Sequence, residues 1–315
     1  MTALRPRLRT LPLGIDVGAS RIRVALAQRN AAGETELIAV ATRCHRDDAA
    51  DALAEAVKEL RTAERRCVFG LGEPRAVLHN ITFPAMRRGE QERAARFEAT
   101  HFVDYPIREA IVRVIPLGAD GSAMVGVVRK DVVGSLVTLA HSAKLRVTAV
   151  DNNAFAFRRA HPNVDAVLDI GLGDSRLHIF SGRFPMSRRF AIGGAAFTAA
   201  VAHALDADEE TAERRKIAFG IAGCADNARD ALIADIADAL AECRAAGLAD
   251  VRTIALAGNG SRLTELPALI EQATAVRVAP AMFGPAISSV VPPDVLRAAS
   301  PDWGLAYGLA LWTAP

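Results

Sequence analysis

Residues 13–26 read LGIDVGASRIRVAL, a pattern of two apolar strands joined by a tight turn that carries Asp16, Gly18 and Ser20. A second copy of this pattern, VLDIGLGDSRLHIF, occupies residues 167–180. Its acid, Asp169, lies 153 positions after Asp16 (169 minus 16), close to half of the 315-residue chain. The repetition predicts two related lobes, each built on a hairpin with an acid at its tip.

The composition is that of a globular protein with a substantial core. Hydrophobic residues make up 51% of the chain, and the formal net charge is only +2. This balance, with 5% aromatic residues, argues against a nucleic-acid partner. The sequence has no apolar run of membrane-spanning length and no secretion signal, and its four cysteines form no C-x-x-C pair. We therefore expect a protein of the reducing cytoplasm.

The order of the expected elements indicates an α/β fold. Strands and amphipathic helices alternate through the first 82 residues, and again from residue 164. Between them, residues 83–145 form a compact helix–strand–strand–helix pattern. This segment is predicted to be an insert in the first lobe.

The chemistry of the turns favours a phosphate ligand. A glycine lets a phosphate approach the backbone, and successive amides of a turn form a nest for an anion. An acid beside such a nest is expected to face Mg²⁺, directly or through water. The alternative is that each turn simply uses Asp and Gly for its geometry.

Two further segments could contribute to a ligand site. Gly258 and Gly260 lie where an apolar strand runs into a helix, in the sequence LAGNGSRL. Glu213 and Lys216 lie one helical turn apart. Taken alone, that pair is better explained as a solvated ion pair.

Together these motifs resemble those of the superfamily that contains actin, the heat-shock chaperone ATPases and FtsA. The motifs are Asp16-x-Gly18, Asp169-x-Gly171, R-x-x-x-G-G at residues 189–194, AERRK at residues 212–216 and AGNGSRL at residues 257–263. Within the superfamily the chain resembles the PilM family of type IV pilus assembly. The resemblance covers nearly the whole chain, including the insert and the closing SPDWGLAYGLAL.

The resemblance implies an actin-like (ribonuclease H-like, duplicated) two-lobe α/β fold with a small α+β insert in the first lobe. The implied units are a first lobe (residues 12–82, 146–163 and 300–315), an insert of the FtsA/PilM type (83–145), a second lobe (164–195 and 250–299) and a helical subdomain of the second lobe (196–249).

The resemblance also implies a site for ATP and Mg²⁺. Asp16 and Asp169 would orient the hydrated metal. The implied nucleotide-binding residues are Asp16, Gly18, Ser20, Asp169, Gly171, Gly173, Ser175, Gly193, Gly194, Glu213, Lys216, Gly258, Gly260 and Ser261. Glu213 and Lys216 would touch ribose and adenine, and the last three would pack on the adenosine.

The sequence departs from the family pattern at a few of these places. Ala19 replaces a common Ser or Thr, Ser175 replaces Thr, and Asn259 splits a Gly-Gly pair. Asp151, the one catalytic candidate, stands where Glu is frequent. We therefore expect nucleotide binding, with ATP hydrolysis weak or absent.

The implied partner is PilN, an inner-membrane protein whose short N-terminal cytoplasmic tail would bind beside the insert. Phe97, Phe102, Val103 and Tyr105 are the candidate lining of that groove, although each could equally belong to the insert's own core. The expected location is the cytoplasmic face of the inner membrane, reached through the partner alone. Self-association is a further contact that the resemblance allows.

Two alternative functions share the implied fold. A ROK-type sugar kinase would use Asp151 in AVDNNAFAF as the base that deprotonates the sugar hydroxyl. The zinc motif and sugar-binding motif of those kinases are missing. An FtsA-like division protein would carry the same insert, but the chain shows no amphipathic tail after its last apolar helix.

Overall fold

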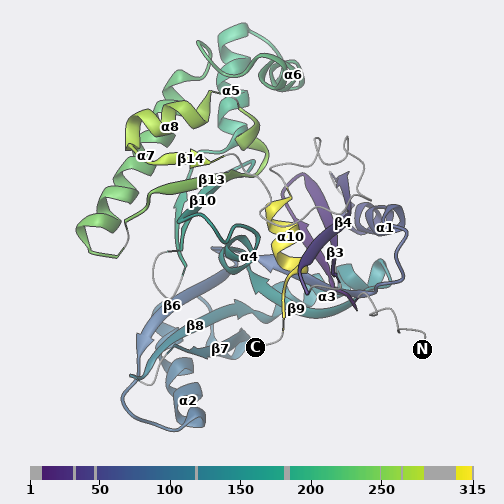
Figure 1. Cartoon of the computed structure of the whole chain (residues 1–315), viewed down its shortest axis with the longest axis vertical. Helices are drawn as coiled ribbons and strands as arrows, with labels where there is room; N and C mark the ends of the chain where they lie inside the picture. Colours follow the sequence, from purple (N-terminus) through teal and green to yellow (C-terminus); the bar gives the residue numbers. More distant parts are fainter. Residues whose placement is uncertain are drawn as a thin grey trace, which may run out of the picture.

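The computed structural model consists of two lobes and a smaller sheet that projects from the first lobe (Figure 1). In Figure 1 the second lobe lies at the top and the smaller sheet at the lower left. The structure describes residues 9–30, 33–45, 48–117, 120–180, 185–248, 250–263, 265–279 and 303–313.

The first lobe is built on a mixed sheet. Its described strands are β1 (Arg9–Thr10), β2 (Leu13–Val17), β3 (Arg21–Arg29), β4 (Thr35–Cys44), β5 (Arg66–Leu71) and β9 (Arg146–Asn152). Strands β2, β3 and β4 form an antiparallel meander, and β5 and β9 continue the sheet in parallel from β2. Helices α1 (Ala49–Glu59) and α3 (Lys130–Ser142) pack on one face, where Leu13, Ile15 and Ile22 are fully buried.

The sheet of the second lobe repeats this arrangement. Its described strands are β10 (Ala166–Ile170), β11 (Ser175–Ile179), β12 (Met186–Phe190), β13 (Thr253–Ala257) and β14 (Arg277–Ala279). Strands β10, β11 and β12 are antiparallel neighbours, and β13 and β14 follow in parallel from β10. The same order of antiparallel and parallel pairing in both sheets confirms the predicted duplication.

Two helices lie between the sheets. α4 (Asn153–Ala160) and α10 (Gly304–Ala310) share one buried cluster with strands of both lobes. Close backbone approach requires glycine here: a Cβ on Gly14 would lie 1.9 Å from the carbonyl oxygen of Ala306, and one on Gly308 equally near that of Ala156. The C-terminal helix therefore closes the first lobe and joins it to the second.

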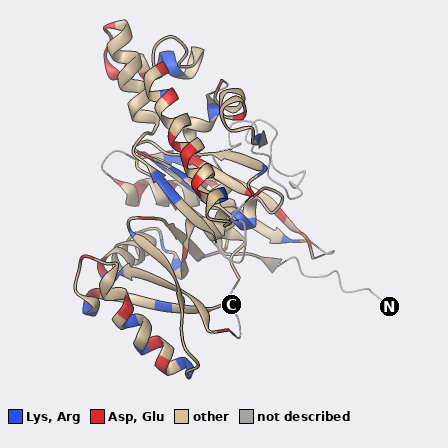
Figure 2. Cartoon of the chain, turned by 90° about the vertical axis from the view of Figure 1, so that its left-hand side faces the viewer, with Lys and Arg blue, Asp and Glu red and all other residues tan. Residues whose placement is uncertain are grey.

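The insert forms its own three-stranded sheet, in the order β6 (Ala76–Thr82), β8 (Ser122–Arg129) and β7 (Ala110–Pro116). Strand β6 comes before the boundary predicted at residue 83, so the sheet takes one strand from a segment that the sequence assigned to the first lobe. Helix α2 (Arg88–Glu98) packs on β7 and continues into the short 3-10 helix η1 (Ala99–His101), and a second, η2 (Ile107–Glu109), leads into β7. Basic and acidic residues alternate along α2, the lowest helix in Figure 2.

The remaining helices belong to the second lobe. They are α5 (Gly194–Leu205), α6 (Glu209–Phe219), α7 (Asp226–Ala245) and α8 (Leu266–Thr274), with the short 3-10 helix η3 (Asn259–Arg262) after β13. Helix α7 buries Leu232, Ile236 and Leu240 in the core beneath the sheet, as its periodicity predicts. Within the described residues, no helix combines the length and apolar character needed to cross a bilayer.

Candidate functional site

The first hairpin carries an acid paired with an arginine on the opposite strand. The amide of Gly18 donates to the carbonyl of Arg21 at 2.9 Å and closes the turn. Asp16, at the end of β2, stands opposite Arg23 on β3, and Nη1 of Arg23 lies 3.1 Å from its Oδ2. Both side chains are largely buried, so the pair is shielded from water.

The second hairpin repeats the turn and the strand register, but its arginine, Arg176, forms its ion pair with Asp174, at 2.8 Å. The amide of Gly171 donates to the carbonyl of Asp174 at 3.0 Å, and Asp169 stands opposite Arg176. Each residue lies 153 positions after its counterpart in the first hairpin. The duplication therefore extends to the turn hydrogen bond and to the position of the arginine.

The two acids lie close together where the lobes meet, because Arg23 joins Asp16 to Asn259 and the neighbouring Gly258 lies against Asp169. We call this place the interlobe site. Burial raises the pKa of Asp169 to about 6, and the neighbouring charge of Asp16 adds to this, while Arg176 and Arg23 oppose it. Burial likewise raises the pKa of Asp16, against the attraction of Arg23. Like charges this close repel each other, and a cation between them would relieve that repulsion.

Arg23 also joins the lobes. Its Nη2 donates to Oδ1 of Asn259, in η3, at 2.8 Å. Arg23 was not among the residues predicted for the site. Side chains alternate between the two faces of a sheet, so the register of the hairpin places Arg23 opposite Asp16. The contact with Asn259 carried no sequence signal.

Helix α5 begins against the second turn. The amides of Gly194 and Ala195 donate at 2.8 Å to the carbonyls of Gly171 and Leu172. A Cβ on Gly193 would lie 2.6 Å from the carbonyl oxygen of Leu172. Gly193 and Gly194 thus fit the turn closely, while Gly173 has open space beside it.

The two predicted hydroxyls differ in environment. Ser175 is fully buried and its Oγ donates to the carbonyl of Ile192 at 2.6 Å, so it braces the turn from within. Ser20 is half-buried in the first turn, and its carbonyl accepts the amide of His45.

Glu213 and Lys216 form a network with α5. Nζ of the largely buried Lys216 lies 2.5 Å from Oε2 of Glu213 and donates to Oγ1 of Thr198 and to the carbonyl of Gly194. Burial raises the pKa of Glu213, but the hydrogen bonds from Lys216 and Thr198 outweigh it, and the net shift is downward. Arg21 of the first lobe lowers it further. The pair is therefore placed beside the second turn and faces the first lobe.

The third loop packs on the end of β10. A Cβ on Gly258 would lie 2.6 Å from Oδ1 of Asp169, and one on Gly260 would lie 2.1 Å from Cγ2 of Ile170. Gly258 also has a φ of 74°, and Oγ of Ser261 donates to its carbonyl at 2.5 Å. The loop thus lies directly against Asp169 in the interlobe site.

Asp151 has a separate environment. It ends β9, where its carboxylate forms an ion pair with Arg159 and accepts the amide of Asn152. Arg159 is itself held by the carbonyl of Gly308. Among the described residues, no hydrogen bond or ion pair connects Asp151 to Asp16 or Asp169.

The four groove candidates separate into one exposed and three core residues. Phe97 is 67% exposed. Phe102 stacks on His79 with ring centroids 4.6 Å apart, and Val103 and Tyr105 pack against the core of the insert. Of these four, Phe97 is the exposed one, with its ring edge-on to that of His101 at 5.7 Å between centroids, and the other three are partly buried.

A cavity of about 260 Å³ lies where the insert and the two lobes meet. Its walls include Leu78 and Met124 of the insert, Glu73 of the first lobe, and Arg176 and His178 of the second. Nη2 of Arg176 donates to the carbonyl of Glu73 at 2.9 Å, so the cavity lies beside a second contact between the lobes.

The residues of the interlobe site fit a magnesium ion that is bound together with phosphates. No group of three or more His, Cys, Asp or Glu side chains gathers in the described part of the chain, so the protein alone offers no complete metal cage. Asp16 and Asp169 do supply two carboxylates in one space. Mg²⁺ commonly uses one or two carboxylates with water and substrate phosphates, which matches this donor set.

Comparisons with known proteins give the family and the fold. The family described as "Type IV pilus assembly protein PilM" matches residues 14–314. No curated protein matches the chain. A solved structure described as the "PilM-PilN type IV pilus biogenesis complex" is 25% identical, with a TM-score of 0.84 over 97% of this chain and 98% of that one.

More distant structures share the architecture. The ethanolamine utilization protein EutJ from Carboxydothermus hydrogenoformans is 14% identical, with a TM-score of 0.60 over 98% of this chain and 91% of its own. The MamK double helical filament is 13% identical, with a TM-score of 0.53 over 96% of this chain and 98% of its own. These likenesses confirm the predicted actin-like two-lobe fold.

Proposed function

Because the chain belongs to the type IV pilus assembly protein PilM family, we propose that it is a nucleotide-binding scaffold of that assembly which holds a PilN-like inner-membrane partner. The observation that supports the nucleotide part is the closeness of Asp16 and Asp169, which stand at equivalent positions of two equivalent hairpins. The partner part is supported by the likeness to the PilM-PilN complex over almost the full length of both chains.

The proposed ligand is ATP with Mg²⁺. Asp16 and Asp169 would hold the hydrated metal, which supplies positive charge to the phosphates. The turns of Gly18 and Ser20, and of Gly171 and Gly173, would present backbone amides to the same phosphates. Gly193 and Gly194 would keep α5 close to the second turn, and Ser175 would brace that turn through Ile192.

The nucleoside would lie toward the second lobe. Glu213 offers a carboxylate to the ribose hydroxyls, and Lys216 fixes it there. Gly258, Gly260 and Ser261 would give the adenosine a surface free of bulky side chains. Glu213 is half-exposed, so its carboxylate is accessible to a ribose. Gly258 has a φ of 74°, which favours glycine and so keeps this surface free of a side chain.

We propose that hydrolysis is slow. A base that activates water needs a lone pair directed at the reacting group. Asp151, the one catalytic candidate, directs its carboxylate to Arg159 and to its own neighbouring amide. This pairing also weakens the sugar-kinase alternative, which needs Asp151 as a free base.

The partner would bind beside the insert as a short peptide from the N-terminal cytoplasmic tail of a PilN-like protein. Phe97 is the exposed anchor, while Phe102, Val103 and Tyr105 support the surface from the insert's core. The protein would then work in the cytoplasm, attached to the inner membrane through this partner. Nucleotide would act by selecting the lobe arrangement that presents the groove.

A two-ligand titration tests this function. The full chain is titrated with a labelled PilN-type tail peptide, with and without saturating Mg-ATP, and with Mg-ATP alone. We expect both to bind, and the peptide to bind more tightly when ATP is present. Absence of ATP binding would remove the nucleotide proposal, and absence of peptide binding would remove the scaffold.

A further inference from the structure

A basic hollow lies on the first lobe, apart from the interlobe site. It has a volume of about 420 Å³ and lies at the C-terminal ends of α1 and α3. The residues that line it are Ala54, Val57, Lys58, Arg61, Thr62, Arg65, Ser142, Ala143 and Lys144. Four are cations, two carry hydroxyl groups, and none is acidic.

The acids nearest to the hollow in sequence are all engaged by other arginines. Glu55 and Glu59 of α1 form ion pairs with Arg43, at 3.3 and 2.5 Å. Glu64 lies 2.7 Å from Nη2 of Arg66. These three carboxylates are therefore paired with arginines that do not line the hollow, and none of the residues that line it is acidic.

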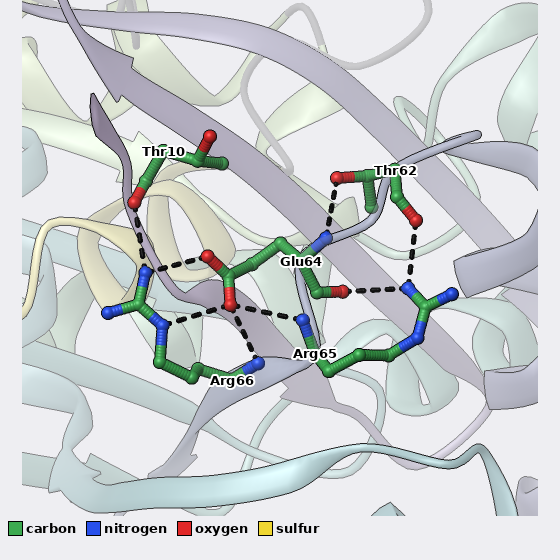
Figure 3. Close-up of polar contacts among 5 residues, drawn as sticks. All are labelled: Thr10, Thr62, Glu64, Arg65 and Arg66. Atoms are coloured by element: carbon green, nitrogen blue, oxygen red, sulfur yellow. Dashed lines mark hydrogen bonds and ion pairs between the residues drawn. The ribbon is translucent and has the colours of Figure 1, made fainter. Parts of the chain in front are cut away.

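Figure 3 shows how the loop before β5 separates these charges. The carboxylate of Glu64 accepts from the side chain of Arg66 and from the backbone amides of Arg65 and Arg66. Burial raises the pKa of Glu64, but the hydrogen bonds from Arg66 outweigh it and hold the carboxylate ionised. The guanidinium of Arg65 lies on the other side of the loop in Figure 3, away from that carboxylate.

Arg65 is also held in place before any ligand arrives. Its Nη1 donates to the carbonyls of Thr62 and Glu64, at 2.8 and 2.9 Å. Oγ1 of Thr62 accepts the amide of Glu64 and stiffens the same loop. A planar guanidinium that is fixed in this way loses little side-chain entropy when it binds an anion.

The helix dipoles account for part of this arrangement. Cations near helix C-termini are favoured by a few tenths of a kcal/mol up to about 1 kcal/mol each. That effect explains Lys58 and Lys144, which lie at the ends of α1 and α3. The helix dipoles do not explain Arg65, which lies outside both helices. Two backbone carbonyl groups hold its guanidinium beside the same hollow.

We propose that this hollow binds the phosphate group of an anionic ligand. Four cations with two hydroxyl groups match the charge and acceptor oxygens of a phosphate. The phosphate could be the headgroup of an anionic phospholipid or part of a soluble phosphate compound, because both present the same oxygens. The proposal is independent of the interlobe site.

Two glycine substitutions test the proposal without endangering the fold. Arg61 and Lys144 have φ angles of 47° and 57°, a region that glycine adopts without strain. The double variant Arg61→Gly/Lys144→Gly therefore removes two of the four cations and should not lower the stability of the fold. Arg93→Gln/Arg96→Gln, on the exposed face of α2, is the matched control with the same change in net charge.

Two binding arms separate the sources of the phosphate. One arm titrates the full chain, in saturating Mg-ATP so that the proposed nucleotide site is occupied, with inorganic pyrophosphate, and the other measures flotation with phosphatidylcholine vesicles with and without phosphatidylglycerol. We expect the glycine variant to bind about 10- to 30-fold more weakly than the control in at least one arm. The interlobe site is unchanged in both variants, so their difference reports the hollow.

The two arms distinguish a soluble phosphate compound from a lipid headgroup. A loss in the pyrophosphate arm identifies a soluble phosphate compound, and a loss in the phosphatidylglycerol arm alone identifies a headgroup. Equal binding by the glycine variant and the control in both arms would overturn the proposal, as would binding by neither.

Discussion

Nη2 of Arg23 in the first lobe donates to Oδ1 of Asn259 in the second lobe over 2.8 Å, although the two residues lie 236 positions apart in the chain. The same guanidinium contacts Asp16 through Nη1. One side chain therefore connects the acid of the first hairpin with the glycine-rich loop of the second lobe. If the proposed nucleotide binds here, we expect this contact to couple its binding to the position of the lobes.

Asn259→Ala tests that coupling. The variant loses the acceptor but keeps the ion pair of Arg23 with Asp16, so we expect the free energy of unfolding to fall by only about 1 kcal/mol. Amide hydrogen exchange at residues 258–261 should become faster in the absence of nucleotide. Unchanged protection of these amides would show that the contact does not hold the lobes together.

Asp169 makes stability depend on pH in a defined window. Its pKa of about 6 in the folded chain exceeds the ordinary 3.8, so the folded state binds the proton more tightly than the unfolded state does. Stability should therefore fall as pH rises from 3.8 to 6, by up to about 3 kcal/mol. Chemical unfolding across this range, without Mg²⁺, measures the slope.

Asp169→Asn should remove most of that slope and weaken Mg-ATP binding, because one of the two metal-facing carboxylates is lost. The matched control is Asp235→Asn on the exposed surface of α7, which should leave both properties unchanged. A pH slope that survives in Asp169→Asn would assign the titration to another group.

Gly258→Ala should distort the loop that lies on Asp169. The new Cβ would lie 2.4 Å from the carbonyl oxygen of Ile170, at a φ of 74° that disfavours alanine. We expect a loss of stability of about 1–3 kcal/mol and weaker nucleotide binding. Gly134→Ala, in the open middle of α3, is the control and should stabilise the chain by about 1 kcal/mol.

Lys216→Met tests whether Lys216 holds the carboxylate of Glu213 in position. The variant keeps the aliphatic volume but removes the contacts with Glu213, Thr198 and the carbonyl of Gly194. We expect ATP affinity to fall about 10-fold or more, since Glu213 loses its fixed position. Arg214→Gln removes an exposed ion pair from the same helix and should have almost no effect.

Phe97→Ser separates the partner surface from the core of the insert. Phe97 is exposed, so the variant should change the unfolding free energy by less than about 0.5 kcal/mol. It should at the same time lower the affinity for the tail peptide. Phe102→Ala, by contrast, should destabilise the insert because Phe102 stacks on His79. Peptide binding that is unaffected by Phe97→Ser would place the groove elsewhere.

Local patterns in the sequence were sufficient to predict many of the turns, strands and helices. The Asp-x-Gly turns, the alternating strands and the 3.6-residue periodicity of α7 depend on neighbours within a few positions, and the structure contains all three. The grouping of Glu213 with Lys216 is also local, since the two lie on one turn of α6. What surrounds that pair, Thr198 and the carbonyl of Gly194, comes from another helix.

Other features depended on contacts that no local pattern encodes. Strand β6 reads like part of the first lobe in sequence, yet its backbone pairs with β8 in the insert. Ser175 lies in a predicted phosphate turn, yet its side chain faces inward to Ile192 because alternate residues of β11 point to opposite faces.

The sequence alone determined the duplicated hairpins, the order of the elements and the residue types at each turn, because these follow from short-range sterics and periodicity. The tertiary structure alone decided that Asp16 and Asp169 lie close together, that Arg23 reaches Asn259, and that Arg61, Arg65 and Lys144 line one hollow. The physical reason is that electrostatic coupling depends on distance through space, which is set by how the two sheets pack around α4 and α10.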